Sequence, residues 1–121
     1  MRQTARLVAT AASIVTLLGS LTLTPISVSQ AKSAVEKGRD IAFNRKKGNC
    51  LACHMIKGGT QPGNMGPPLI GIGKRYTKEA LKAQIWDATK KNPNSPMPPF
   101  GRHKILTDKE LDLVVEFIHT L

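Results

Sequence analysis

The chain has 121 residues, and its 18 lysines and arginines outnumber its 8 aspartates and glutamates to give a formal net charge of +10. This length leaves room for one small domain and excludes a large multidomain enzyme. The two cysteines exclude a framework of several disulfides, and the excess of positive charge favours acidic or anionic partners.

Residues 1–31 have the pattern of an export signal. A basic start with Arg2 and Arg6 precedes an uncharged run over residues 7–23, and small residues suited to a cleavage site end at Ala31. This order predicts a secretory signal peptide and hence a periplasmic protein. An uncleaved membrane anchor is the alternative, although the run is slightly shorter than the roughly 18–20 apolar residues that span a bilayer.

Removal of the signal would leave one domain, residues 32–121, with 16 basic residues, all 8 acidic ones and a net charge of +8. An acidic docking partner suits an exported protein of this charge better than nucleic acid does. The basic runs Arg45-Lys46-Lys47 and Lys90-Lys91 contain no aromatic residue on which a base could stack. Membrane association is expected only if the signal stays uncleaved.

The first predicted helix begins with a capping box formed by Ser33 and Glu36. It is expected to run to about Lys47, with Gly48 as the glycine that ends it. Gly38 in its middle costs about 1 kcal/mol relative to alanine. Close approach of another helix would offset this cost.

The next motif is Cys50-Leu51-Ala52-Cys53-His54, which is typical of covalent haem attachment. Each thiol adds to one vinyl group of the porphyrin, and the histidine then offers its imidazole to the iron. A redox-active or disulfide-bonded cysteine pair is the alternative. A zinc site is disfavoured, because no second cysteine pair is present. The motif therefore predicts one covalently bound haem c. The porphyrin would enlarge the thin core of such a small domain, so the haem-free chain is expected to fold poorly.

The remainder of the chain predicts two more helices separated by loops. A loop rich in glycine and proline spans residues 58–68 and is too broken for a helix or strand. Thr77 caps a helix expected over Lys78 to Lys90, and Leu81, Ile85 and Ala88 mark its expected buried side. A proline-rich loop follows over residues 93–99. Thr107 and Glu110 form a second capping box before the terminal helix. The predicted class is all-α, with three main helices and loops wrapped around one haem.

The sixth iron ligand is expected to be a methionine. Met55 adjoins His54 and cannot reach round the ring, whereas Met97 lies between prolines that restrict its backbone. We expect His54 and Met97 to bind the iron and Met65 to pack in the core. Alternative ligands are His103 and His119. Ligation by histidine and methionine raises the reduction potential and leaves no open site, which favours electron transfer over substrate chemistry.

With these residues in view, the chain resembles the class I cytochromes c. Gly66-Pro67-Pro68-Leu69 is similar to the Gly-Pro-x-Leu loop of that family. The resemblance implies that the Pro67 carbonyl accepts a hydrogen bond from His54 and that Leu69 packs on the haem. It also implies that Gly38 and Phe117 lie where the first and last helices cross.

A closer resemblance is to SoxX, the monohaem subunit of the SoxAX cytochromes of bacterial thiosulfate oxidation. It covers nearly all of residues 33–121, and its more specific parts are Ile85-Trp86-Asp87 and the run from Met97 to His103. The resemblance implies a heterodimer with a SoxA-like monohaem or dihaem cytochrome, which couples thiosulfate to a cysteine of the carrier SoxYZ. The SoxX-like chain would then be the non-catalytic subunit that passes electrons to a soluble acceptor cytochrome.

Two other functions fit the same haem ligands. One is a freestanding soluble electron shuttle, which would need no partner subunit. The other is an enzyme or ligand sensor in which Met97 leaves the iron and opens a site. Lys74, Arg75 and Trp86 could neutralise or bind the haem propionates, and Arg102 and His103 could lie at a docking face.

Overall fold

The computed structural model describes residues 32–121, so the predicted signal peptide lies outside the described residues. Four α-helices are present: α1 (Ala34–Phe43), α2 (Ile72–Arg75), α3 (Lys78–Trp86) and α4 (Asp108–Ile118). Two short 3-10 helices, η1 (Cys50–Ala52) and η2 (Ala88–Lys90), lie between them. Residues 32–121 contain no strand, which confirms the predicted all-α class. None of the helices in this range is long and apolar enough to cross a membrane.

Both predicted capping boxes are confirmed. The Ser33 hydroxyl accepts from the Glu36 amide, and the Glu36 carboxylate accepts from the Ser33 amide at 2.7 Å. Thr107 and Glu110 make the same reciprocal pair at the start of α4. Each box satisfies amide groups that the first helical turn would leave unpaired, so the starts of α1 and α4 are encoded locally.

The predicted end of the first helix was wrong by four residues. α1 ends at Phe43, because Asn44 is extended and its side-chain oxygen accepts a 2.8 Å hydrogen bond from the Lys46 amide. Asparagine side chains compete with the helix for backbone groups in this way. Gly48 therefore does not cap the helix; its missing side chain lets the chain return against Ile41.

The end predicted for the second helix was also too late. α3 stops at Trp86, because Asp87 is extended and its carboxylate accepts from the Thr89 amide to start the separate helix η2. The expected buried side of this segment is confirmed, since Leu81, Ile85 and Ala88 are all buried. The short helix α2 was not predicted.

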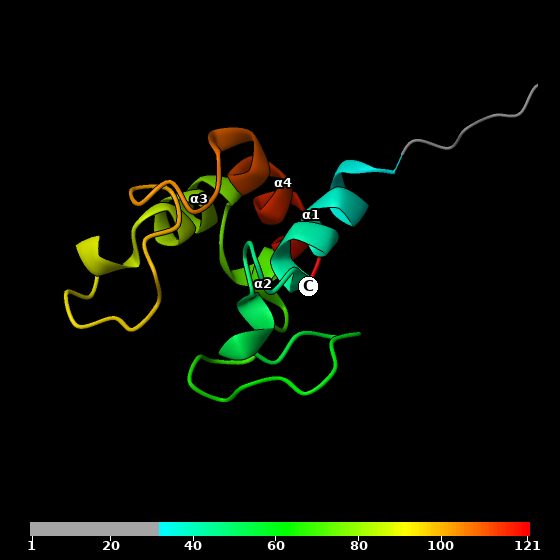
Figure 1. The fold of residues 1–121 in the computed structure, drawn as a ribbon, viewed down its shortest axis with the longest axis horizontal. Coiled ribbons are helices and arrows are strands. Elements are labelled where there is room, and N and C mark those ends of the chain that lie inside the picture. Colours follow the sequence, from blue (N-terminus) through cyan, green and yellow to red (C-terminus); the bar gives the residue numbers. More distant parts are fainter. Residues whose placement is uncertain (1–31) are drawn as a thin grey trace, which may run out of the picture.

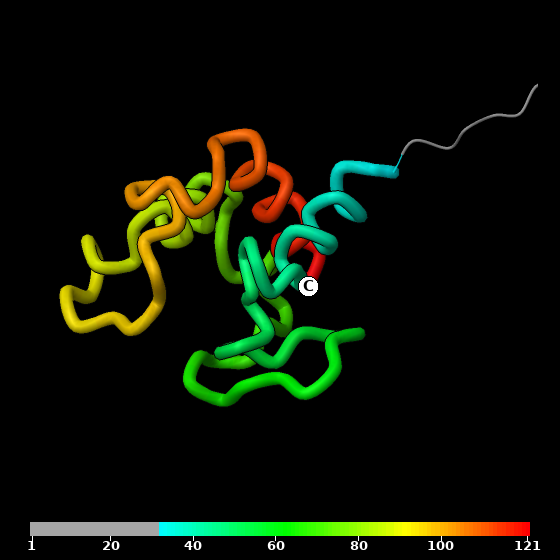
Figure 2. The backbone as a smooth tube through the Cα atoms, viewed as in Figure 1, coloured from blue at the N-terminus to red at the C-terminus, as the bar shows by residue number. Residues whose placement is uncertain are grey.

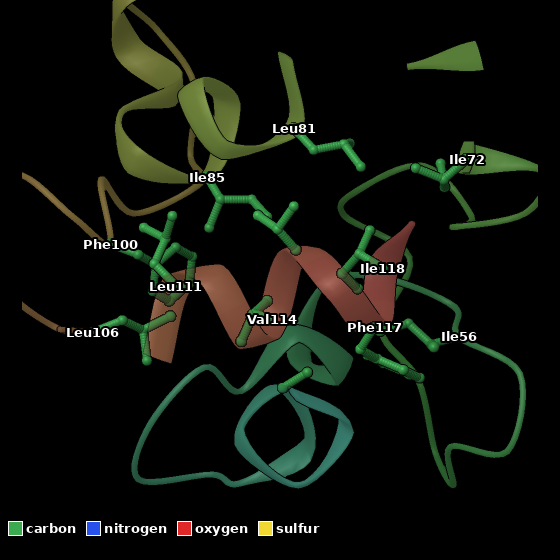
Figure 3. Close-up of a cluster of buried hydrophobic side chains, with 12 residues drawn as sticks. Ile56, Ile72, Leu81, Ile85, Phe100, Leu106, Leu111, Val114, Phe117 and Ile118 are labelled. Atoms are coloured by element: carbon green, nitrogen blue, oxygen red, sulfur yellow. The ribbon is translucent and has the colours of Figure 1, made fainter. Parts of the chain in front are cut away.

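Helix α4 lies at the centre of the core, as Figure 3 shows. Its residues Leu111 and Val114 are almost completely buried. Buried side chains from segments that precede α4 belong to the same cluster, namely Ala42, Ile56, Ile72, Leu81, Ile85, Phe100 and Leu106. Burial of a large apolar side chain contributes about 1.5–3 kcal/mol, and five of the twelve buried residues of this cluster belong to α4.

Helices α1 and α4 cross at Gly38 (Figure 1). This crossing was predicted both by the glycine in the middle of the first helix and by the resemblance to class I cytochromes c. A methyl group built on Gly38 would lie 1.9 Å from the Leu113 carbonyl oxygen. Phe117 packs beside this crossing and makes an edge-to-face contact with Phe43, with ring centroids 5.8 Å apart. The helices can approach this closely only because residue 38 has no side chain.

Two long loops leave the helical part of the molecule. In Figures 1 and 2, the green segment around residues 57–70 and the yellow-to-orange segment around residues 91–99 extend away from the crossed helices. The chain end is held near the first of these loops, because the Ile72 amide donates to the Leu121 carbonyl at 2.6 Å. Residues of both loops line one cavity.

Candidate cofactor site

The two cysteines and His54 come from one tight turn directly after α1. Asn49 adopts the left-handed conformation, with φ 47°, and redirects the chain into η1. The His54 amide donates to the Cys50 carbonyl at 2.9 Å, which closes a single helical turn over the motif. Both sulfurs and the imidazole are therefore presented within one turn, as the sequence pattern predicted.

The state of the cysteines argues against the alternative interpretations of the motif. Cys50 and Cys53 are not bonded to each other. Burial raises the pKa of the Cys50 thiol to about 11, whereas reactive redox cysteines have lowered pKa values. Within residues 32–121, no three histidine, cysteine or acidic side chains are grouped to hold a metal ion, which disfavours a zinc site.

The orientation of His54 is fixed from the glycine–proline loop. Its Nδ1 atom lies 2.7 Å from the Pro67 carbonyl oxygen, which is the hydrogen bond that the resemblance implied. A methyl group built on Gly66 would lie 2.4 Å from Cε1 of the same ring. The loop therefore packs its backbone directly on the imidazole, and the occupied Nδ1 leaves Nε2 for a metal.

A cavity of about 1040 Å³ brings the expected site residues together. Its lining includes Cys50, Cys53, His54, Leu69 and Met97. Seven other lining residues belong to the buried core, namely Ile72, Leu81, Ile85, Phe100, Leu106, Val114 and Ile118. Small-molecule cavities range from about 300 to 1000 Å³, so this one suits a large apolar cofactor.

The donor set fits haem c. Two thiols that can form thioethers, one imidazole with an oriented ring and one thioether sulfur all face the same apolar cavity. These are the groups that attach and ligate the haem of a c-type cytochrome. Gly66 adds to the fit, since only a residue without a side chain leaves the imidazole in place.

The structure separates the candidate axial ligands. Met97 is half-buried and lines the cavity, whereas His103 and His119 do not line it. Met55 is exposed and also lies outside the lining. The expectation that Met65 packs in the core was wrong, because its side chain is 71% exposed at the cavity rim. The geometry therefore favours Met97 over the two histidines.

The loop around Met97 is supported on both sides. The Met97 amide donates to the Ser95 hydroxyl at 3.3 Å, and the Ser95 amide donates to the Asn92 carbonyl at 2.9 Å. On the other side, Pro99 and Phe100 are buried. Met97 is thus the half-buried residue of an otherwise irregular segment whose ends are tied to the fold.

The basic runs noted in the sequence lie at the same cavity. Arg45, Lys46, Lys47, Arg75, Lys90 and Lys91 all contribute to its lining. Of the residues considered for propionate contacts, only Arg75 lines the cavity. Lys74 lies in a separate shallow pocket, and Trp86 packs against Gly101. The rim is therefore strongly positive.

Asp87 was expected only as part of the Ile85-Trp86-Asp87 stretch that resembles SoxX, with no role of its own. The side chain is 3% exposed and lines the cavity, and its carboxylate pairs with Arg102. An aspartate after the apolar face of a helix was the available signal, but its partner is fifteen residues away and could not be identified from spacing.

Comparison with known proteins shows to which family the chain belongs. The family model described as cytochrome c matches residues 35–121. The chain belongs to the cytochrome c family. It is thus a c-type cytochrome, a class of electron-transfer protein that carries covalently attached haem c.

Among solved structures, the chain is similar to SoxXA from P. pantotrophus, with a TM-score of 0.66 and 28% identity. The similarity covers 78% of this chain and 85% of that one, and it bears out the SoxX-like resemblance. A lipoprotein of Aquifex aeolicus, described as uncharacterized, is 37% identical over an alignment of 80 residues, and the match covers 61% of this chain. The cytochrome spans only 37% of that lipoprotein's length.

Proposed function

We propose that this cytochrome is an exported, periplasmic electron carrier with a single His/Met-ligated haem, and that it acts as the SoxX-like subunit of a SoxAX complex in thiosulfate oxidation. The observation that carries the proposal is the single cavity that joins Cys50, Cys53, His54 and Met97, in a chain whose fold is similar to SoxXA.

In this proposal, each site residue has one task. Cys50 and Cys53 attach the porphyrin through thioethers, and the Nε2 atom of His54 binds the iron while the Pro67 carbonyl holds its ring. Met97, which lines the same cavity, would supply its sulfur to the iron, and Leu69 contributes to the apolar wall. The bound haem supplies a one-electron ferric/ferrous couple.

The expected iron ligands and the small number of cysteines favour electron transfer over chemistry on a bound substrate. If His54 and Met97 both held the iron, no coordination site would remain for a substrate. Cys50 and Cys53 are the only cysteines in the sequence, so no thiol remains to carry sulfur. The chain is accordingly proposed as the non-catalytic partner of a SoxA-like cytochrome, which would act on the carrier SoxYZ.

The positive rim of the cavity supports docking to acidic surfaces near the haem edge. Its arginines and lysines come from three separate segments around residues 45–47, 75 and 90–91. Charge complementarity of this kind accelerates association and weakens as salt screens it. A soluble acceptor cytochrome that takes electrons from this chain is therefore expected to present an acidic face.

The ligand assignment is tested by spectroscopy of the purified protein. Ferric haem with methionine ligation has a weak sulfur-to-iron charge-transfer band at the red edge of the visible spectrum. We expect this band in the wild type and in Met65→Ala, and we expect its loss in Met97→Ala. Survival of the band in Met97→Ala would refute the ligand assignment.

The partner is tested by isolating the native periplasmic protein. Size exclusion should show the cytochrome co-eluting with a second, larger haem protein. A stable monomer that reduces an oxidase alone would favour the freestanding shuttle instead. Tight binding of carbon monoxide to the reduced wild type at neutral pH would favour a sensor or enzyme, because it requires a ligand that leaves the iron.

A further inference from the structure

The methionine loop is closed at its base by contacts between its two ends. The segment leaves α3 at Asp87, carries Met97 at the cavity and returns to the fold at Arg102. Residues 91–99 contain no helix and include four of the prolines. In Figures 1 and 2 this yellow-to-orange segment lies away from the crossed helices α1 and α4. The position of Met97 therefore depends on how the base is held.

The backbone forms the first part of this base. The Trp86 carbonyl accepts hydrogen bonds from the amides of Gly101, at 3.1 Å, and Arg102, at 3.2 Å. The Trp86 indole packs on Gly101 so closely that a methyl group built there would lie 2.0 Å from its Cδ1 atom. The end of α3 and the return of the loop are thus in direct contact.

The second part of the base is a buried carboxylate. Asp87 Oδ2 lies 2.9 Å from Arg102 Nε, and Oδ1 accepts from the Thr89 amide at 3.1 Å and the Thr89 hydroxyl at 2.5 Å. The Arg102 Nη2 group donates to the same hydroxyl at 3.4 Å. Both carboxylate oxygens therefore have partners. The Thr89 hydroxyl, together with its amide and the Arg102 charge, lowers the pKa of Asp87 below its usual 3.8.

We propose that the Asp87–Arg102 pair is a clasp that positions Met97 for its bond to the haem iron. This inference rests on the His/Met ligation of the proposed function and adds two positioning residues to it. Neither residue supplies an iron ligand. Their role is to fix the separation of the loop ends, and thereby to restrict the conformations from which Met97 can leave the cavity.

The clasp differs from the other ion pairs of the described residues. Lys32–Asp40, Lys78–Glu116 and Lys82–Asp112 join side chains that are all more than a third exposed, and in Lys47–Glu110 the carboxylate is still 21% exposed. Such exposed pairs contribute little. Asp87, by contrast, is the buried charged side chain among residues 32–121. Removal of its partner would leave a carboxylate without its countercharge inside the fold, which is strongly unfavourable.

The test uses two single variants and a matched control in the haem-loaded protein. Asp87→Asn keeps an oxygen that can accept from Thr89 but removes the charge that pairs with Arg102. Arg102→Gln removes the other charge from a half-exposed position, where misfolding is a smaller risk. Asp112→Asn is the control, because it removes one carboxylate from an exposed pair between α3 and α4 whose residues do not line the cavity.

Three measurements report on the methionine bond and the loop. In both clasp variants we expect a weakened or absent sulfur-to-iron band, carbon monoxide binding by the reduced form and a lower reduction potential, since methionine ligation raises it. We also expect the Gly101 and Arg102 amides to exchange hydrogen at least about tenfold faster. Asp112→Asn should behave like the wild type in every measurement.

The double variant Asp87→Asn/Arg102→Gln decides whether the two residues act together. If they form one clasp, its effect should be smaller than the sum of the single effects. A wild type without the band would overturn the ligation and the clasp together. A band that is present in the wild type and unchanged in both single variants would overturn the clasp alone.

Discussion

The crossing of α1 and α4 allows a direct test of the packing, through Gly38→Ala. In an exposed helix this substitution would stabilise the fold by about 1 kcal/mol. Here the new methyl group would lie 1.9 Å from the Leu113 carbonyl oxygen, whereas a carbon–oxygen contact is normally at least about 3.3 Å. Because both partners belong to helical backbone, the two helices must move apart by more than about 1 Å.

The expected result is a net loss of stability. Overpacking of a core costs about 1–3 kcal/mol, and often more when backbone must move, so it exceeds the gain in helix propensity. A net loss of about 1–2 kcal/mol should lower the melting temperature by roughly 4–8 °C for each kcal/mol. Circular dichroism of the haem-loaded protein measures this, and Lys37→Ala on the exposed side of α1 is the control. A melting temperature equal to or above that of the wild type would refute the close crossing.

Three further predictions address the site and the fold. Gly66→Ala should displace the His54 ring, because its methyl group would lie 2.4 Å from Cε1 of that ring. The haem absorption spectrum should therefore shift and the reduction potential should fall. An unchanged spectrum would contradict this prediction. The pKa of Glu110 is lowered from its usual 4.5, chiefly by the hydrogen bond from Lys47, so its stabilising effect is present above about pH 4.5 and is lost as the pH falls through the lowered value. The melting temperature of Glu110→Gln should therefore lie below that of the wild type at neutral pH and approach it as the pH falls through the lowered pKa. A haem-free protein, made by replacing both cysteines of the motif with alanine, should lack a cooperative thermal transition, and near-native melting would show that the polypeptide core suffices.

The elements that the sequence predicted well are those whose signals are local. The capping boxes at Ser33 and Thr107 placed two helix starts, and apolar spacing identified the buried side of α3. The helix ends failed because Asn44 and Asp87 use their side chains to bond nearby amides and leave the helical conformation. Such competition depends on the conformation finally adopted, so propensity alone does not reveal it.

The residues of the candidate site also fall into those that local sequence predicted and those that it did not. The cysteine–histidine turn could be identified from spacing, because its chemistry is contained in five consecutive residues. The rim position of Met65 could not, since it depends on how a glycine–proline loop lies against the rest of the fold. The contact between Asp87 and Arg102 likewise requires the return of a long loop, and no periodic pattern connects the two residues.

The most direct test of the whole account is the intact mass of the protein purified from the periplasm of cells that mature c-type cytochromes. We expect a species that begins after Ala31 and whose mass exceeds that of its polypeptide by one haem. The haem should be retained after denaturation, because it is bound covalently through Cys50 and Cys53. A colourless protein whose mass equals that of the polypeptide alone would contradict it.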